Sequence, residues 1–167
     1  MGFFDKLKDI ADTAAKVSDV IKSAKTDGKQ FHDDVFYATG TAYYPDSFKK
    51  ILKLNKEYKS FPGTIIKNGH AGKRIYEYLY LDTKAKLVSE PTNKYDKNAV
   101  KVCVDGKTVG YIKREETGVI RDILKKTQIE YIRAFVSGGK YKIVSLNKEV
   151  TNVEDGFSVR INIGYYR

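Results

Sequence analysis

The chain is organised around the stretch Leu87-Val-Ser-Glu-Pro-Thr-Asn-Lys-Tyr-Asp-Lys-Asn-Ala-Val-Lys-Val-Cys-Val-Asp-Gly-Lys-Thr-Val-Gly-Tyr-Ile112. Valines at alternate positions from Val100 to Val104 have the two-residue period of a half-buried strand. Asp105-Gly106 predicts a tight hairpin, because glycine tolerates the positive φ that a type I′ turn requires. Before the hairpin, residues 90–98 are too polar and turn-rich to be core. This loop carries one aromatic residue, and loops of this kind are where binding residues concentrate.

Short strands separated by turns account for most of the remaining sequence. Besides the central hairpin and the strand that ends at Val88, we predict strands at 34–44, 75–81, 129–136, 141–145 and 157–163. The 141–145 strand is expected to pair back on 129–136 through a Gly138-Gly139 turn, and 164–167 to form a tail. Helices are predicted over 64–68, over 115–127, and from Asp46 or Ser47 through Tyr58. The pattern indicates an α+β, mainly β fold, either a small barrel or a strongly curved sheet.

Residues 2–25 form a predicted amphipathic helix that precedes this domain. Apolar residues recur there at steps of three and four, and acidic and basic residues alternate on the opposite face. Three roles are open for this helix: packing on its own domain, pairing with another copy or a protein partner, and contact with a membrane. Membrane contact is the least favoured, because the polar face is nearly balanced in charge. We expect a helix and linker at 1–28 and a β-barrel domain at 29–167.

The composition is that of a soluble basic domain, and such domains most often meet polyanions, nucleic acid first and anionic membranes second; the alternative is that the lysines only keep the protein soluble. Thirty-one Lys and Arg against 21 Asp and Glu give a net charge of +10 and a pI near 9.4, values typical of nucleic-acid-binding domains. Thirteen Tyr and eight Phe add aromatic rings that can stack on unpaired bases. The single Cys103 excludes an internal disulfide framework, is expected to be a small buried strand residue, and fits a cytoplasmic location.

The sequence offers little for catalysis. His32 and His70 lie in unrelated contexts, and neither has a partner at metal-ligand or triad spacing. Glu90 and Asp96 flank the polar loop and could hold a metal in a nuclease, although Asp in such a loop more often caps the amides of a turn or accepts a hydrogen bond from a hydroxyl. We therefore predict a non-enzymatic protein without a metal or cofactor.

The central stretch resembles the HIRAN domain. The run from Leu87 through Asp96-Lys-Asn-Ala-Val and the Val109-Gly-Tyr-Ile112 return strand match that family's loop and hairpin, and Phe36-Tyr-Ala-Thr-Gly-Thr-Ala-Tyr-Tyr44 resembles its first strand. The resemblance covers about residues 34–163. It implies an OB-like β-barrel that captures the 3′-hydroxyl end of single-stranded DNA.

The resemblance also implies roles for individual residues. Tyr43 and Tyr44 would stack on the terminal nucleotides, Tyr95 would contact the end base, and Asp96 would accept a hydrogen bond from the 3′-hydroxyl. Arg114 would pair with a phosphate. The full set of expected nucleic-acid-binding residues is Tyr43, Tyr44, Asn93, Tyr95, Asp96, Tyr111, Lys113 and Arg114.

Two departures from the family pattern bear on this expectation. Ala42 stands where helicase-associated members often carry Arg, and the span 45–86 is longer than theirs. The alternative function is a protein-interaction adaptor that acts through the N-terminal helix, with the barrel as scaffold. Salt-insensitive affinity, or no nucleic-acid binding, would favour the adaptor.

Overall fold

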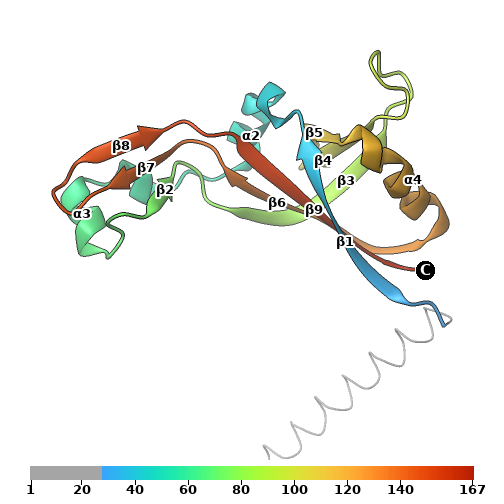
Figure 1. The fold of residues 1–167 in the computed structure, drawn as a ribbon, viewed down its shortest axis with the longest axis horizontal. Coiled ribbons are helices and arrows are strands. Elements are labelled where there is room, and N and C mark those ends of the chain that lie inside the picture. Colours follow the sequence, from blue (N-terminus) through green and yellow to red (C-terminus); the bar gives the residue numbers. More distant parts are fainter. Residues whose placement is uncertain (1–27) are drawn as a thin grey trace, which may run out of the picture.

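The structure is a computed structural model that describes residues 28–167. The amphipathic helix predicted at 2–25 lies outside the described residues. Within them, fifteen short elements alternate along the chain, and nine of these are strands (Figure 1). No helix among residues 28–167 is long and apolar enough to cross a membrane.

Six antiparallel strands form a closed barrel, in the order β1-β5-β4-β3-β6-β9. The longest pairing joins β6 to β9, and β9 then pairs with β1 to close the barrel. This architecture confirms the predicted mainly β fold. The barrel strands are β1 (Phe31–Thr39), β3 (Leu81–Ser89), β4 (Val100–Val104), β5 (Lys107–Ile112), β6 (Gln128–Gly138) and β9 (Phe157–Tyr166).

The barrel core follows from the alternation of apolar residues along these strands. Val100, Val102 and Val104 of β4 are fully buried, as predicted from their period, and so are Ile161 and Ile163 of β9. Two helices extend the same core, α2 (Pro45–Ile51) through the fully buried Phe48 and α4 (Thr117–Lys126) through Ile120 and Ile123. The barrel and its two helices thus share one continuous apolar interior.

A second, smaller sheet extends away from the barrel along the long axis of the molecule (Figure 1). We call it the lobe, residues 56–76 and 141–153. Its buried apolar cluster consists of Ile65, Ile75 and Val144, and Tyr141 is buried as well. Its elements are η2 (Lys56–Lys59), α3 (Pro62–Lys67), β2 (Arg74–Tyr76), β7 (Tyr141–Val144) and β8 (Val150–Val153), with the sheet in the order β2-β7-β8.

The predicted pairing of 141–145 on 129–136 is wrong. β7 pairs with β2 and β8, while β6 pairs with β9 along its whole length to Gly138. Gly138 and Gly139 have φ of 91° and 82°, and a Cβ on Gly138 would collide with the Gly156 carbonyl oxygen. The two glycines therefore let the chain pass close to residue 156 and leave the barrel, where a hairpin would have turned back on β6.

The predicted helix from 46–47 through Tyr58 is also too long. α2 ends at Ile51, Leu52 is extended at ψ 145°, and Leu54 forms a β-bridge with Tyr78. Tyr58 belongs to η2, whose first turn is capped by the Asn55 side chain accepting from the Glu57 backbone N–H at 3.0 Å. The helical spacing of the apolar residues between Phe48 and Tyr58 therefore comes from two separate elements, α2 and η2, and not from one helix.

The predicted strand 75–81 with a tyrosine face is interrupted. Only Arg74–Tyr76 is a strand, and the tyrosines pack on three different rings: Tyr76 on Tyr141, Tyr78 on Phe157 and Tyr80 on Phe135. The chain leaves the lobe here and enters the barrel, so one strand cannot serve both sheets.

Smaller differences concern the strand ends. Cys103 is half-buried on the outward side of β4, so the expected full burial is wrong. The predicted tail 164–167 is mostly strand, because β9 continues as far as Tyr166, paired to β1 and β6. β8 was not predicted, because it is only four residues long and nearly all exposed.

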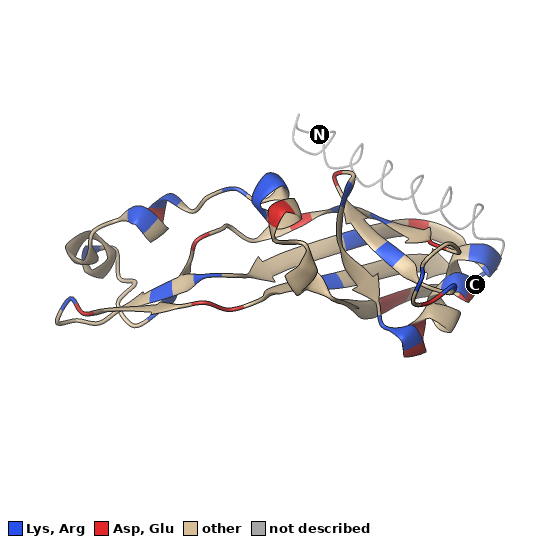
Figure 2. Cartoon of the chain, turned by 90° about the horizontal axis from the view of Figure 1, so that it is seen from above, with Lys and Arg blue, Asp and Glu red and all other residues tan. Residues whose placement is uncertain are grey.

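The hairpin and the following helix are confirmed. Asp105 and Gly106 have φ of 46° and 72°, the positive values that the type I′ turn requires. The helix predicted at 115–127 appears as a short turn, η3 (Arg114–Glu116), followed by α4. Lys and Arg are spread over the barrel, α2 and the lobe, so the positive charge is not confined to one patch (Figure 2).

Candidate nucleic-acid interface

The loop 90–98 lies beside the outer wall of the barrel where β1, β5 and β4 meet. Tyr111 of β5 lies opposite Thr39 of β1 on one side and Lys101 of β4 on the other. Two adjoining hollows of about 580 and 250 Å³ open here and share four lining residues. Together we call them the loop pocket, lined by Thr39, Gly40, Tyr43, Tyr44, Asn93, Tyr95, Asp96, Ala99, Tyr111, Ile112 and Arg114.

Seven of the eight residues predicted from the sequence therefore come together in one place. Lys113 is the exception: it is exposed immediately before η3 and does not line the pocket. No lining residue of the loop pocket comes from the span 45–86, so within residues 28–167 the long insertion leaves the pocket uncovered. Ala42 instead lines a separate hollow of about 430 Å³ beside α2.

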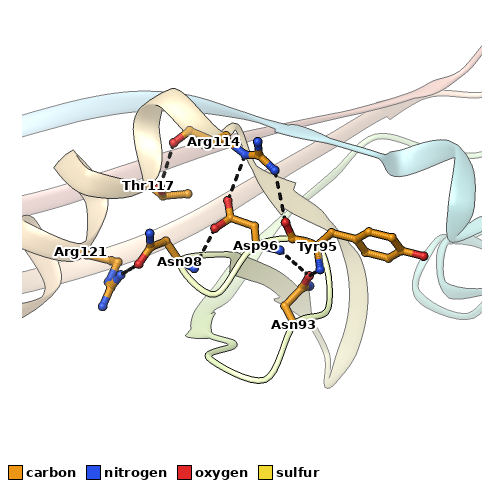
Figure 3. A network of polar contacts seen from close by, with 7 residues as sticks. All are labelled: Asn93, Tyr95, Asp96, Asn98, Arg114, Thr117 and Arg121. Carbon is orange, nitrogen blue, oxygen red and sulfur yellow. Dashed lines mark hydrogen bonds and ion pairs between the residues drawn. The ribbon is translucent and has the colours of Figure 1, made fainter.

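Asn93 gives the loop its shape. Its Oδ1 accepts from the backbone N–H groups of Tyr95 at 2.9 Å and Asp96 at 3.1 Å, and its Nδ2 donates to Glu90 at 2.8 Å. An asparagine whose side chain binds amides two and three residues ahead replaces a backbone turn. Its polar atoms are thus engaged within the loop. The turn leaves Tyr95 90% exposed, with its ring pointing away from the polar contacts (Figure 3).

Glu90 joins the loop to the barrel wall. One of its carboxylate oxygens accepts from the Tyr111 hydroxyl at 2.9 Å and from Asn93, and the other lies 3.3 Å from the Lys101 ammonium. The hydrogen bond from Asn93, followed by that from Tyr111, lowers the pKa of the Glu90 carboxyl below its ordinary value. Glu90 therefore stays ionised and fixes the loop against β5 and β4. Sequence reasoning considered this residue only as a metal ligand.

Tyr111 remains a neutral hydrogen-bond donor. Burial, then the neighbouring Tyr44 hydroxyl and the Glu90 carboxylate, raise the pKa of the Tyr111 phenol well above its ordinary value. The Tyr44 ring lies 6.3 Å from that of Tyr111, so the two half-buried rings form the floor of the pocket.

Tyr43 is presented by a sharp turn at the end of β1. Gly40 has φ of 69°, a left-handed conformation that ends the strand and leads into η1 (Thr41–Tyr43). The Tyr43 side chain is 85% exposed. The loop pocket thus has one exposed tyrosine from η1 and another, Tyr95, from the loop.

Asp96 and Arg114 form an ion pair at the edge of the pocket. One Asp96 oxygen accepts from the Asn98 backbone N–H at 2.8 Å, and the other lies 3.3 Å from Arg114 Nε (Figure 3). The Asp96 side chain is 20% exposed and that of Arg114 76% exposed. Such an exposed pair contributes little to stability, so the guanidinium can exchange the carboxylate for another anion at low cost. The carboxylate itself is held by the backbone of its own loop.

The backbone beneath Arg114 is fixed by α4. The Thr117 hydroxyl donates to the Arg114 carbonyl oxygen at 2.8 Å, and Thr117 is buried at the start of the helix. Arg121 of α4 donates to the Asn98 side chain (Figure 3). The helix therefore supports both sides of the Asp96–Arg114 pair. Thr117 and Arg121 did not stand out in the sequence.

The acidic residues here do not form a metal site. Within residues 28–167 no group of three His, Cys, Asp or Glu side chains is placed to hold an ion. The carboxylates of Glu90 and Asp96 face different cations, Lys101 and Arg114.

Comparisons with known proteins identify the family of the chain. No curated protein sequence matches it. The crystal structure of the HIRAN domain of human HLTF is similar at 20% sequence identity, with 80% of this chain and 74% of that one covered and a TM-score of 0.39. The family model of the HIRAN domain matches residues 35–162. Because this match spans most of the sequence, the chain belongs to the HIRAN domain family, a non-catalytic module known to bind DNA 3′ ends.

Proposed function

We propose that the loop pocket binds the 3′-hydroxyl end of single-stranded DNA. The observation that carries this proposal is the Asp96–Arg114 pair, a carboxylate and a guanidinium 3.3 Å apart beside two exposed tyrosine rings. A strand end offers a hydroxyl donor, a phosphate and a base at neighbouring positions. Each of these three groups has a matching partner in the pocket.

Selection of an end would come from the Asp96 carboxylate. A free 3′-hydroxyl donates a hydrogen bond to it, whereas a 3′-phosphate or an interior phosphodiester places like charge against it. Because the Asn98 amide already holds one oxygen of this carboxylate, Asp96 stays in place when Arg114 leaves. Arg114 would then turn from Asp96 to the last phosphate and keep its charge paired.

Affinity would come mainly from the tyrosines. Stacking of a base on an aromatic ring contributes about 1–3 kcal/mol without reading sequence. Tyr43 and Tyr95 are exposed enough to take part. Glu90 and Asn93 would act as positioning residues, since they hold the loop and the Tyr111 hydroxyl before DNA arrives and so reduce the cost of ordering on binding.

The test is a titration of one oligonucleotide with either a 3′-hydroxyl or a 3′-phosphate. We expect the hydroxyl end to bind at least about tenfold more tightly, a difference of about 1.4 kcal/mol. Asp96→Ala should lose this preference while keeping most of its overall affinity. Asp122→Ala is the matched control, because Asp122 forms an ion pair with Lys126 on α4, away from the pocket. Equal affinity for the two ends in the native protein would refute end capture.

The adaptor alternative predicts a different result in the same experiment. Without a nucleic-acid site, both oligonucleotides would bind weakly or not at all. DNA binding through Arg114 and neighbouring lysines instead requires that affinity falls as salt rises.

A further inference from the structure

A row of aromatic and cationic side chains crosses the outer wall of the barrel outside the loop pocket. In the strand register, Tyr37 of β1 lies opposite Arg160 of β9, and Arg160 lies opposite Phe135 of β6. Tyr80, just before β3, packs on the far side of Phe135, with ring centroids 6.2 Å apart. We call these four residues the outer row.

The outer row does not belong to the barrel core. Its strand residues alternate with Phe36, Ala134 and Ile161, which are buried on the inner side. Tyr37 and Tyr80 remain 48% and 59% exposed. The Arg160 guanidinium carbon lies 4.4 Å from the centroid of the Phe135 ring, and this contact holds the arginine against the wall. The wall thus presents ring faces and a fixed planar cation to solvent.

The charge around the outer row favours an anionic ligand. The acidic residue nearest to it by register, Asp82, lies opposite Phe135 and accepts two hydrogen bonds from Arg133, at 2.9 and 2.7 Å. Lys84 lies opposite Arg133 on the same outward side. The acid is therefore neutralised, and Arg160 and Lys84 remain without a carboxylate partner among the ion pairs of residues 28–167.

The outer row also adjoins the loop pocket. Tyr37 and Thr39 project from the same face of β1, two residues apart, and Thr39 lines the pocket. Two residues along a strand span about 7 Å, and neighbouring strands are about 4.8 Å apart. A polymer that leaves the pocket across β1 meets Tyr37 first, then Arg160, then Phe135 and Tyr80.

We propose that the outer row binds the single strand on the 5′ side of the captured end, with bases stacked on Tyr37 and Tyr80 and a phosphate held by Arg160. The direction of the strand rests on the proposed function of the loop pocket. The row itself is an independent surface for single-stranded nucleic acid. Stacking of bases on rings and pairing of phosphates with cations do not depend on which base is present, so we expect this surface to bind any sequence.

The experiment measures affinity of the full chain for oligothymidylates of about three, six and nine nucleotides, each with a 3′-hydroxyl and with a 3′-phosphate. Native protein should gain at least about tenfold in affinity from the shortest to the longest. Tyr37→Ala and Tyr80→Ala should each remove about five- to tenfold of affinity for the longest oligonucleotide and leave the shortest unchanged. Phe61→Ala is the control, because Phe61 is an 83% exposed aromatic residue on the lobe.

Arg160→Gln supplies a second readout that a loss of folding would not produce. For the longest oligonucleotide, the slope of log affinity against log salt should fall by about 0.7, the value for one phosphate contact on a single strand. For the shortest oligonucleotide the slope should not change. Circular dichroism of each variant must match that of the native protein.

The outcomes separate the two proposals. One outcome is equal affinity for the 3′-hydroxyl and 3′-phosphate oligonucleotides, while affinity still rises with length in the native protein and no longer does so in Tyr37→Ala. That outcome overturns end capture and supports the outer row. Affinity that does not depend on length, or variants that affect all lengths equally, overturns the outer row whatever the end preference. That second result is also the one expected if another segment of the chain or a protein partner covers the wall.

Discussion

The barrel and the lobe are both antiparallel sheets, yet they are held together very differently. The barrel closes on itself around a core to which β1, β4, β5, β6, β9 and two helices all contribute buried residues. The lobe has an open three-stranded sheet, a small cluster of three buried aliphatic residues, and exposed apolar side chains such as Phe61 and Leu146. The candidate site is built on the barrel strands and on the turns and loop that join them, with no residue from the lobe. A pocket that requires fixed side chains is therefore found where core packing holds the backbone most firmly.

The largest expected effect is a loss of barrel packing. Ile161→Ala should lower the free energy of unfolding by about 3–5 kcal/mol, because it removes a fully buried side chain from the middle of the barrel. Ile75→Ala in the lobe should cost less, about 1–2 kcal/mol, because the small lobe can open without unfolding the barrel. Denaturant unfolding with hydrogen exchange checks both. Loss of protection in β1 and β9 on substitution of Ile75 would mean that the two sheets are one cooperative unit.

The same contrast explains what the sequence could predict. The β4–β5 hairpin, the end of β3 and α4 were predicted because local signals, an alternation of valines, an Asp-Gly turn and a helical spacing, agree with their tertiary places. In the lobe, the strand at 141–145 and the helix at 64–68 were predicted and appear as β7 and α3. The lobe sheet itself was not predicted, because β2 and β7 pair across about 65 residues of sequence. Gly138-Gly139 does mark the end of β6, but the chain does not turn back on that strand, because its path depends on contact with residue 156.

The site shows the same division. Seven of the eleven residues that line the loop pocket were predicted through the family resemblance, and the structure brings Tyr43, Tyr95, Asp96 and Arg114 among them to one place. Their supports were not predicted. Glu90 binds Tyr111 and Lys101 across three strands, and no sequence spacing encodes these contacts.

Substitution of a glycine between β1 and β5 should have an effect of intermediate size on stability. Gly110 in β5 has φ of 156°, and a Cβ there would lie 2.7 Å from the Thr39 carbonyl oxygen. Gly110→Ala should therefore push β1 from β5 beneath the pocket and lower the free energy of unfolding by about 2 kcal/mol.

Gly63 in the lobe is the matched control, because it lies in α3 and a Cβ added there would meet no other atom within 4 Å. Gly63→Ala should be neutral or stabilising by up to about 1 kcal/mol. Thermal unfolding of the two variants checks both values, and a Gly110→Ala protein as stable as the native one would mean that β1 and β5 are not closely joined.

A third, smaller effect should separate binding from stability. Glu90→Ala removes the acceptor shared by Asn93 and Tyr111, so affinity for a 3′-hydroxyl oligonucleotide should fall about five- to tenfold with little change in unfolding temperature. Glu57 is the counterpart in the lobe, where its carboxylate contacts His70 at 2.6 Å. Glu57→Ala should leave DNA affinity unchanged. Equal losses in both variants would point to a general loss of negative charge.

The smallest effect is a pH dependence of the loop. The pKa of the Glu90 carboxyl in the folded protein is lowered from its ordinary 4.5, mainly by the hydrogen bond from Asn93. The stabilisation of the loop is therefore complete above pH 4.5 and is lost as pH falls through the lower folded pKa. The side-chain amide resonance of Asn93 should shift over this range. A shift centred above pH 4.5 would contradict the assignment to Glu90.

The central claim is that the loop pocket holds a 3′ end through Asp96, and a crystal structure with a short 3′-hydroxyl oligonucleotide tests it most directly. We predict the terminal O3′ at about 2.5–3.0 Å from an Asp96 carboxylate oxygen, a base on Tyr95, and Arg114 turned to a phosphate. An empty loop pocket, with Arg114 still paired to Asp96 and the strand bound elsewhere on the protein, would contradict the account.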